Sequence, residues 1–427
     1  MVEGAVFGPP FSFGAGSAKV ETSSLEHAPQ LPMNKVFDIA VIGGGVVGLA
    51  ILRFLALAGQ RAVLLERGPD ILSGASKGNS ALLHTGFDAP PGSLELSCMK
   101  EGRAEYLAIR ERLNLPLLET SALVVAWSEE ERAKLATIAA KAATNGIDDV
   151  HELSRAELAA AEPRLSPEAL AALRVPGEHV IDPWSAPLAY GHQAIAHGAE
   201  IRRNCEVTGG EFRRGYWRLK AGGEEVAARI VVNAAGNFGD LVEAMARQPT
   251  FRILPRRGQF IVFDKPAHDL VGAIILPVPT ARTKGVVLFR TIFGNLAIGP
   301  TAEDVEEREV AACDGETLDR LRVRAIAMVP ALAGIGINAI YAGLRPASER
   351  SDYIIEALPK QNWITVAGIR STGLTSALGI ARHVGRLHDA HFGTLTPREP
   401  SSWTPVANLA EHLPRPYATG GSIICHC

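Results

Sequence analysis

Apolar and polar positions alternate in blocks along the chain, and the clearest block lies between residues 38 and 66. Residues 39–42 form a continuous apolar run, which is typical of a strand buried on both faces. Three glycines follow, then an apolar run with helical spacing, and then an apolar strand over residues 62–65 that ends at Glu66. This order predicts a βαβ unit and therefore an α/β fold with a parallel sheet.

The glycines of this unit have the G-x-G-x-x-G spacing, at Gly43, Gly45 and Gly48. The first permits a tight turn, the second lets a pyrophosphate approach the backbone, and the third lets the helix pack closely on the strand. A pyrophosphate there would lie on the helix N-terminus, where N–H groups and the helix dipole favour an anion. Glu66 stands where an acid accepts hydrogen bonds from a ribose. We therefore predict a bound dinucleotide.

Helices with clear start signals follow. One is predicted from Ser93, with Cys98 on its apolar stripe, which indicates a core residue and not a nucleophile. Ser128 and Ser154 are each followed three residues later by glutamate, and both pairs fit the capping box. A further helix is predicted over residues 304–331.

Two later glycine-flanked turns resemble the first in pattern. Strands are predicted over residues 200–207, 217–221 and 225–232, and the last of them leads into the small residues 233–236. A strand over residues 363–368 is followed by a helix that opens at Gly373. Three such turns far apart in one chain predict a long cofactor that is contacted at several points.

Composition narrows the class of protein. A chain of 427 residues is long for one core, so two domains are expected. The formal net charge of −3 gives no reason to expect nucleic acid or an anionic membrane surface as a partner. No apolar run has membrane-spanning length, and five cysteines form no disulfide framework, so we expect a cytoplasmic protein. Residues 1–33 are expected to be a disordered extension, and Met33 is a hypothetical natural start.

Several motifs together resemble a known family. They lie over residues 43–48, 76–86, 233–236 and 368–375, with further marks at 255–259, 299–302 and 343–346. In this order they resemble the D-amino-acid oxidase superfamily of FAD enzymes, over about residues 35–389. Within it the chain is similar to the glycerol-3-phosphate dehydrogenase and L-2-hydroxyglutarate oxidase branch.

The resemblance implies an α/β architecture with a Rossmann-type FAD-binding domain of the GR2/DAO-like kind and a second, mixed-sheet substrate domain. The FAD-binding domain would comprise residues 34–110, 176–250 and 336–392. The substrate domain would comprise residues 111–175 and 251–335.

FAD is the cofactor that the resemblance implies, and it assigns contacts by position. The ADP half would be bound by Gly43, Gly45, Gly48 and Glu66, with Arg67 in the same site. The flavin side would be lined by Ser76, Asn79 and Ser80, and adenine would contact the backbone of Val207. Ala235 and Gly236 would pack on the dinucleotide, and the flavin pyrimidine would receive N–H groups from Gly373, Leu374 and Thr375.

Oxidation of a carbinol by a flavin needs a base for the hydroxyl proton and cations for an acidic substrate. His84 is the candidate base, because it follows the flavin-side loop and the family has a histidine at the matching place. Arg345 and Arg370 are candidates for an anion clamp, since a guanidinium matches carboxylate or phosphate with paired donors. Lys284 is a weaker candidate, for which a solvated loop is the alternative.

The last residues, 393–427, are predicted to form a tail that ends in Cys425-His426-Cys427. Relatives often continue from a Cys-x-Cys into a [2Fe-2S] module, which needs four thiolates. A remnant of that module and a module completed by another subunit are two interpretations of the tail, and a solvated tail is the favoured one. We predict no cluster and no metal site in this chain.

Three hypotheses for the activity stay open. The first is oxidation of a small anionic 2-hydroxy acid or polyol phosphate by hydride transfer to flavin N5. The second is oxidation of a secondary amine, an opine or an amino acid. The third is a flavin electron-transfer subunit of a hetero-oligomer. The acceptor that re-oxidises the flavin, whether oxygen, a quinone or a partner protein, and the oligomeric state are not given by the sequence.

Overall fold

The computed structural model describes residues 36–279 and 285–407. The described residues from 37 onward belong to one compact unit. The predicted extension over residues 1–33, the candidate Lys284 and the tail motif at residues 425–427 lie outside the described residues.

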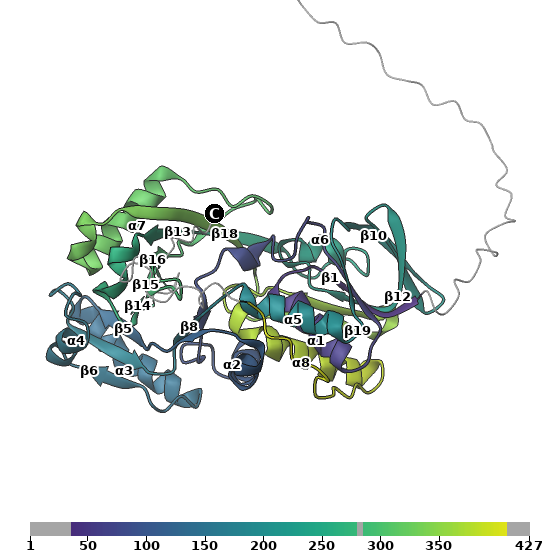
Figure 1. The fold of residues 1–427 in the computed structure, drawn as a ribbon, viewed down its shortest axis with the longest axis horizontal. Helices are drawn as coiled ribbons and strands as arrows, with labels where there is room; N and C mark the ends of the chain where they lie inside the picture. Colours follow the sequence, from purple (N-terminus) through teal and green to yellow (C-terminus); the bar gives the residue numbers. More distant parts are fainter. Residues whose placement is uncertain (1–35, 280–284, 408–427) are drawn as a thin grey trace, which may run out of the picture. The chain divides into compact units, whose positions relative to one another are not determined.

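The first sheet has eight strands and contains the predicted βαβ unit (Figure 1). Its strands are β1 (Val36–Ile42), β2 (Ala62–Leu65), β9 (Glu200–Arg202), β10 (Val207–Arg213), β11 (Tyr216–Ala221), β12 (Glu224–Asn233), β19 (Ile354–Leu358) and β20 (Trp363–Ala367). The order is β10-β11-β12-β1-β2-β9, with β20 pairing β12 and β19. β1 and β2 are parallel, with Ile39 opposite Ala62, as the continuous apolar runs predict.

Helices on this sheet place the glycine turns. They are α1 (Val46–Leu57), α2 (Leu94–Leu113), α5 (Ser185–Ala196), α6 (Gly239–Glu243) and α8 (Gly373–His391). α1 packs against α5 and α8, and α8 also packs against α2, in the part of Figure 1 where α1, α5 and α8 are labelled together. A Cβ atom at Gly102 would lie 2.2 Å from the carbonyl oxygen of Thr375, so the predicted stripe of α2 is what lets α8 approach. Cys98 on this stripe is fully buried, as predicted.

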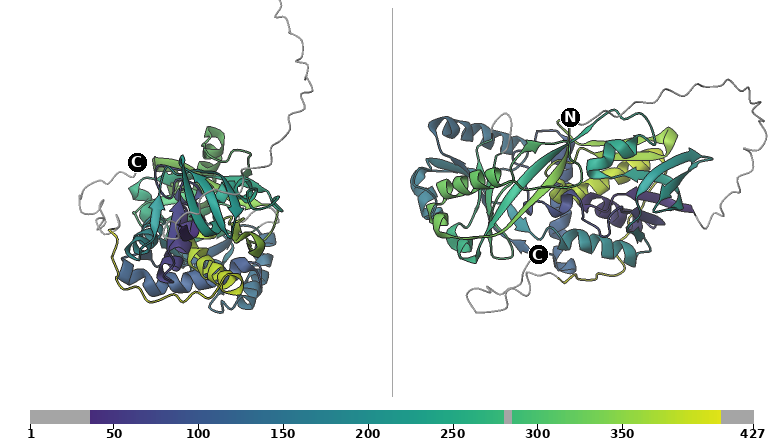
Figure 2. Two further views of the ribbon diagram at one scale, coloured as in Figure 1. Left: turned by 90° about the vertical axis from the view of Figure 1, so that its right-hand side faces the viewer. Right: turned by 90° about the horizontal axis from the view of Figure 1, so that it is seen from above.

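The second sheet is a mixed sheet of nine strands. It is formed by β5 (Ala122–Ala126), β6 (His151–Leu153), β7 (Ala171–Val175), β13 (Ile253–Phe263), β14 (Ile274–Pro277), β15 (Val287–Arg290), β16 (Leu296–Gly299), β17 (Glu303–Asp304) and β18 (Ile337–Ser348). The long strands β13 and β18 are antiparallel neighbours, which Figure 2 shows from above. Arg345 of β18 lies opposite Arg256 of β13.

Short elements complete the described fold. A three-stranded sheet of β3 (Leu82–Leu83), β8 (His179–Ile181) and β4 (Leu117–Leu118) joins distant segments. The remaining helices are α3 (Glu129–Thr144), α4 (Arg155–Ala161) and α7 (Gly315–Met328), with 3-10 turns at Ala75–Lys77, Gly236–Phe238, Lys265–Leu270, Pro330–Gly334 and Pro359–Gln361. The predicted two-domain division stays a prediction. β18, which lies in the predicted FAD-binding segment 336–392, is a strand of the second sheet.

The predicted N-terminal caps of α3 and α4 depend only on neighbouring residues, and Ser128 and Ser154 both form them. Ser154 and Glu157 form the capping box at α4. Ser128 caps α3, but the Glu131 carboxylate accepts from the N–H of Trp127 and not from that of Ser128. The predicted capping box at Ser128 is therefore only half formed, because the glutamate bonds to the residue before Ser128.

Two element predictions were wrong. The helix expected over residues 304–331 begins only at Gly315, because Asp304 is paired with β13 and the carboxylate of Asp314 caps the helix through the N–H of Thr317. The strand expected over residues 200–207 is divided, because Asn204 has a φ of +52° and interrupts the extended backbone between β9 and β10.

Candidate functional site

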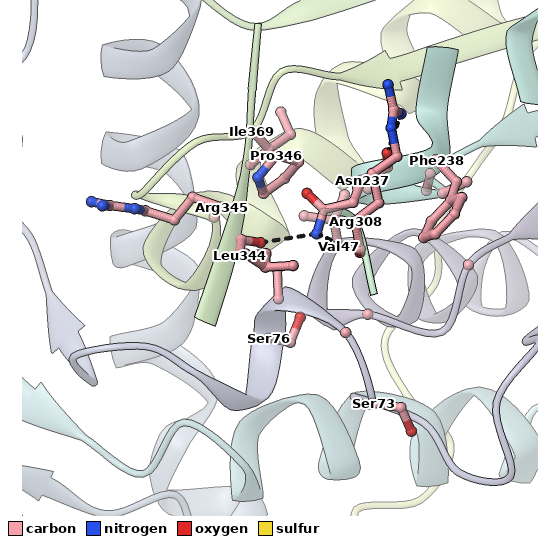
Figure 3. A pocket seen from close by; sticks show the side chains of 18 of the residues that line it. Val47, Ser73, Ser76, Asn237, Phe238, Arg308, Leu344, Arg345, Pro346 and Ile369 are labelled. Atoms are coloured by element: carbon pink, nitrogen blue, oxygen red, sulfur yellow. Dashed lines mark hydrogen bonds between the residues drawn. The ribbon is translucent and has the colours of Figure 1, made fainter. Parts of the chain in front are cut away.

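One cavity of about 1010 Å³ lies where the three glycine turns converge. Its size is at the upper end of that usual for small-molecule sites, as an extended ligand requires. The lining includes residues 42–47, 65–68, 73–80, 205–208, 234–238, 308–311, 342–346 and 366–371, with Gly373 and Leu374 (Figure 3). Segments more than 300 residues apart in sequence therefore contribute to one site.

The first two turns touch through their backbones. Gly43 has a φ of +110°, and a Cβ atom there would lie 2.4 Å from the carbonyl oxygen of Ala234. A Cβ atom at Gly48 would lie 2.0 Å from the carbonyl oxygen of Gly43. Only glycine meets both conditions, and the result is an open backbone cradle at the start of α1.

Side chains at the same end fix the turn. The Glu66 carboxylate accepts the N–H groups of Gly44 and Gly68, both at 2.7 Å. The Ser76 hydroxyl accepts the N–H of Val46 at 3.0 Å, at the first turn of α1. Glu66 thus holds its own turn closed while it faces the cavity.

The flavin-side loop is fastened to β18. Gly343 and Gly78 meet backbone to backbone, since a Cβ atom at Gly343 would lie 2.4 Å from the carbonyl oxygen of Gly78. The Tyr341 hydroxyl donates to the carbonyl of Asn79 at 3.0 Å. Asn237, from the second turn, donates to the carbonyl of Leu344 at 3.1 Å, the dashed line in Figure 3. One strand therefore supports two of the cavity's walls.

Arg345 of β18 is held by backbone carbonyl groups. Its guanidinium donates to the backbone carbonyls of Arg256, Arg257 and Thr301. Within residues 36–279 and 285–407 it forms no ion pair, because the nearby Asp304 is bonded to Arg256 at 2.7 Å. Burial lowers the pKa of Arg345 to about 10, helped by the charge of Arg256, so it stays protonated at neutral pH.

The other two arginines of the predicted site are already engaged. Arg370 lines the cavity, but its guanidinium donates to the carbonyl of Ser351 and lies 3.9 Å from the Glu95 carboxylate. Arg67 pairs with Glu309 at 2.9 Å and lies over the ring of Phe238, 3.9 Å from its centroid. Both are held at the cavity rim by partners that the sequence analysis did not identify.

His84 lies next to the cavity without lining it. Its backbone N–H donates to the hydroxyl of Thr375 at 3.1 Å, one residue beyond the lining residue Leu374. Its Nδ1 is 2.8 Å from Oε2 of Glu178, a fully buried carboxylate. Burial opposes ionisation of Glu178, but the charge and hydrogen bond of His84 and the bonds from Thr85 outweigh it and lower the pKa.

Glu178 was missed by the sequence analysis. It directly precedes a short apolar strand and has no motif around it. The only available signal was the possibility that residues 82–83 pair with 179–180, which a single sequence does not reveal.

The structure places the predicted cofactor residues as follows. Those that line the cavity are Gly43, Gly45, Glu66, Arg67, Ser76, Asn79, Ser80, Val207, Ala235, Gly236, Gly373 and Leu374. Gly48 and Thr375 lie one turn or one residue behind the lining and support it. Among the described residues, no group of three or more His, Cys, Asp and Glu side chains is placed to hold a metal ion. No helix in this part of the chain is both long and apolar enough to cross a bilayer.

Comparison with known families assigns this architecture. The family model described as FAD dependent oxidoreductase matches residues 38–387. This chain is an FAD dependent oxidoreductase. The predicted family and fold class are therefore confirmed, and the cofactor is FAD.

Individual relatives agree with this assignment. Glycerol 3-phosphate dehydrogenase of Caloramator mitchellensis is 32% identical over 353 residues, 82% of this chain and 73% of that protein. L-2-hydroxyglutarate dehydrogenase of Salmonella houtenae is 27% identical over 316 residues, 70% of this chain and 74% of that one. The dithionite-reduced, FAD-bound L-alpha-glycerophosphate oxidase of Mycoplasma pneumoniae superposes with a TM-score of 0.81 at 26% identity, covering 88% of this chain and 100% of the other.

The residues present in the cavity fit FAD. The glycine turn at Gly43 and Gly45 leaves backbone exposed to an anion at the start of α1, and the start of α8 contributes Gly373 and Leu374 to the same cavity. An extended dinucleotide has both an anionic centre and a flat ring end to be held, and these two helix starts match them.

The cavity edge over residues 305–314 is fixed by an ion pair. Arg308 donates to both carboxylate oxygens of Asp240, at 2.5 and 2.9 Å, and to the carbonyls of Asn237 and Ile253. The Asp240 side chain is only 7% exposed. Burial opposes its ionisation, but the bonds from Arg308 and the N–H of Ile253 outweigh it and lower the pKa of Asp240.

We expect Asp240→Asn to lower the free energy of unfolding by about 3 kcal/mol at pH 7, because the Arg308 charge would stay behind without its partner. A folded pKa below the unfolded one stabilises the protein above pH ~4 and loses this effect as the pH falls through the folded pKa. Urea denaturation between pH 7 and pH 3.5 should therefore show a steeper loss in the parent than in the variant. Asp304→Asn, at an exposed ion pair, is the control, and equal pH slopes in parent and Asp240→Asn would contradict the assignment.

Proposed function

We propose that this oxidoreductase oxidises a small anionic polyol phosphate or 2-hydroxy acid, with glycerol 3-phosphate as the first candidate. The observation that carries the proposal is Arg345, a protonated guanidinium of the cavity lining that is held by backbone carbonyls and has no carboxylate within ion-pair distance among the described residues. A phosphate or carboxylate would supply the missing negative charge. The names of the similar proteins, glycerol 3-phosphate dehydrogenase and L-2-hydroxyglutarate dehydrogenase, support the same substrate class.

In this proposal each part of the site has one task. Arg345 fixes the anionic end of the substrate, and Arg370 adds a second, partly neutralised charge at the rim. His84 accepts the proton of the hydroxyl group that is oxidised. Bound FAD supplies the acceptor for the two electrons of that C–H bond. Lys284 stays a weaker candidate, outside the described residues.

We also propose the cofactor contacts by position. The pyrophosphate would lie at Gly43 and Gly45, and the ribose would be contacted by Glu66, which faces the cavity although it already accepts two backbone N–H groups. The adenine end would lie by Val207 and the flavin end by Ser80 and Leu374. The electron acceptor would be a quinone, oxygen or a partner protein.

An anaerobic bleaching experiment tests the substrate class. The FAD-loaded protein is mixed without oxygen with glycerol 3-phosphate, L-2-hydroxyglutarate, glycerol and an opine, and flavin absorbance near 450 nm is followed. We expect rapid bleaching by one of the two anionic alcohols and none by glycerol, which lacks the charge. Bleaching by the opine alone would favour the amine hypothesis. No bleaching by any of them would favour an electron-transfer subunit.

A further inference from the structure

Glu178 is the buried charge that the proposed chemistry does not yet use. The antiparallel pairing of β3 with β8 puts Leu83 opposite His179, so the next positions along the two strands, His84 and Glu178, face each other. The contact between them is thus dictated by strand register across 94 residues of sequence. A carboxylate placed in this way costs free energy unless its oxygens are hydrogen-bonded.

Both carboxylate oxygens are bonded, each by a different group. Oε1 accepts the backbone N–H of Thr85 at 2.6 Å and its hydroxyl at 2.8 Å. Oε2 lies 2.8 Å from His84 Nδ1. The two bonds from Thr85 to one oxygen restrain rotation of the Glu178 carboxylate. Thr85 therefore holds the carboxylate in the position in which it contacts His84.

The backbone around Glu178 is built for close approach. A Cβ atom at Gly177 would lie 2.8 Å from the Thr85 methyl group and 3.4 Å from Arg103 Nη2. The Thr120 hydroxyl also donates to the backbone carbonyl of Glu178, at 3.0 Å. A side chain at position 177 would push the carboxylate away from His84.

An ionised carboxylate only accepts hydrogen bonds, so the Nδ1 of His84 must carry the proton that is shared with Glu178. In a neutral imidazole the other nitrogen, Nε2, is then the one with a lone pair. The backbone bond from His84 to Thr375 keeps the residue beside the start of α8, where the cavity lies.

We propose that Glu178 is the positioning residue of the active site: it fixes His84 in the Nδ1–H tautomer, so that Nε2 accepts the substrate proton. The proposal rests on the proposed function only for the identity of the proton donor. The other charged groups near this pair are Arg103 of α2 and His179 of β8, with Glu119 and Asp149 facing those two. A buried anion in contact with an imidazole favours its protonated form.

Nitrogen NMR of the histidine rings tests the inference without any substrate. His84 is assigned by difference from His84→Asn, and its ring is titrated in the FAD-loaded parent and in Glu178→Gln. In the parent we expect the Nδ1–H tautomer, and in Glu178→Gln a titration midpoint about 1–3 pH units lower. Glu162→Gln removes another buried carboxylate that accepts backbone N–H groups, and it should leave the His84 signal unchanged.

Kinetics add a second readout. With glycerol 3-phosphate as probe, Glu178→Gln should slow flavin reduction about 10–100-fold at pH 7 and move its acid limb to lower pH, with little change in KM. Thr85→Val, which keeps the carboxylate but removes one anchor, should give a smaller effect in the same direction.

The outcomes separate the two ideas. An unchanged His84 titration in a folded Glu178→Gln protein overturns the positioning role, whatever the substrate. A shifted titration in a protein that no hydroxylated anion reduces would support the positioning role and refute the proposed function. If Glu178→Gln does not fold, the tautomer and midpoint in Thr85→Val decide, and values equal to the parent's reject the inference.

Discussion

Arg345→Met should lower kcat/KM for glycerol 3-phosphate by about 10²–10³-fold while FAD stays bound. Truncating one partner of a desolvated, hydrogen-bonded charge pair costs about 2–5 kcal/mol, and each 1.4 kcal/mol is a factor of ten. The guanidinium is held by three carbonyl groups, so it does not have to be ordered when an anion arrives. Stopped-flow flavin reduction measures the effect, and absorbance of the bound flavin measures retention of the cofactor.

Removal of the neighbouring ion pair, in the double variant Arg256→Met/Asp304→Asn, is the matched control for this result. Arg256 lies directly opposite Arg345 on the neighbouring strand, but its charge is already paired with Asp304 at the surface. We expect less than about a threefold change, since exposed ion pairs contribute little. Equal losses in the two variants, or a normal rate in Arg345→Met, would show that Arg345 does not hold the substrate's anion.

Gly43→Ala should weaken FAD binding strongly and destabilise the protein. The new methyl group would meet the Ala234 carbonyl oxygen at 2.4 Å, and the backbone there has a φ of +110°. To relieve this clash, the turn at Gly43 must move away from the turn at Ala234, and both turns line the cavity. We expect at least a 100-fold weaker FAD affinity by fluorescence titration and a loss of several kcal/mol in urea denaturation.

Gly59→Ala is the control that separates the effect of backbone strain from the effect of a steric clash. Gly59 also has a positive φ, of +75°, but nothing lies within 4 Å of the position that its Cβ would take. It should lose about 1–2 kcal/mol of stability from backbone strain alone and bind FAD normally. Normal FAD binding by Gly43→Ala would mean that the contact between the two turns is dispensable.

What could be predicted from the sequence was mainly local. The strand, glycine turn and helix around residue 45 can be recognised within thirty residues, because the apolar spacing and the glycine positions that define them involve near neighbours in the sequence. The cap at Ser154 is equally local. The three turns predicted one long ligand because each has the same small-residue pattern after a strand, and the family pattern identified that ligand as FAD.

What could not be predicted depends on contacts between distant segments. Glu178 gains its role only when β3 pairs with β8. Residues 305–314 have a helical appearance, but the bonds from Arg308 to Asp240 hold them in an irregular path. Arg370 was predicted as part of an anion clamp and Arg67 as part of the cofactor site, and the tertiary partners that engage both of them could not be read from the sequence.

β18 has a consequence for how coenzyme loading and substrate recognition are linked. The strand that carries Arg345 is also the one against which Gly78 is pressed and to which Asn237 is bonded. If binding of the nucleotide displaces either loop, β18 should move with it, and the position of the Arg345 guanidinium should change. FAD binding should therefore change the affinity for the substrate, and the protein without FAD should bind the proposed anionic substrates weakly.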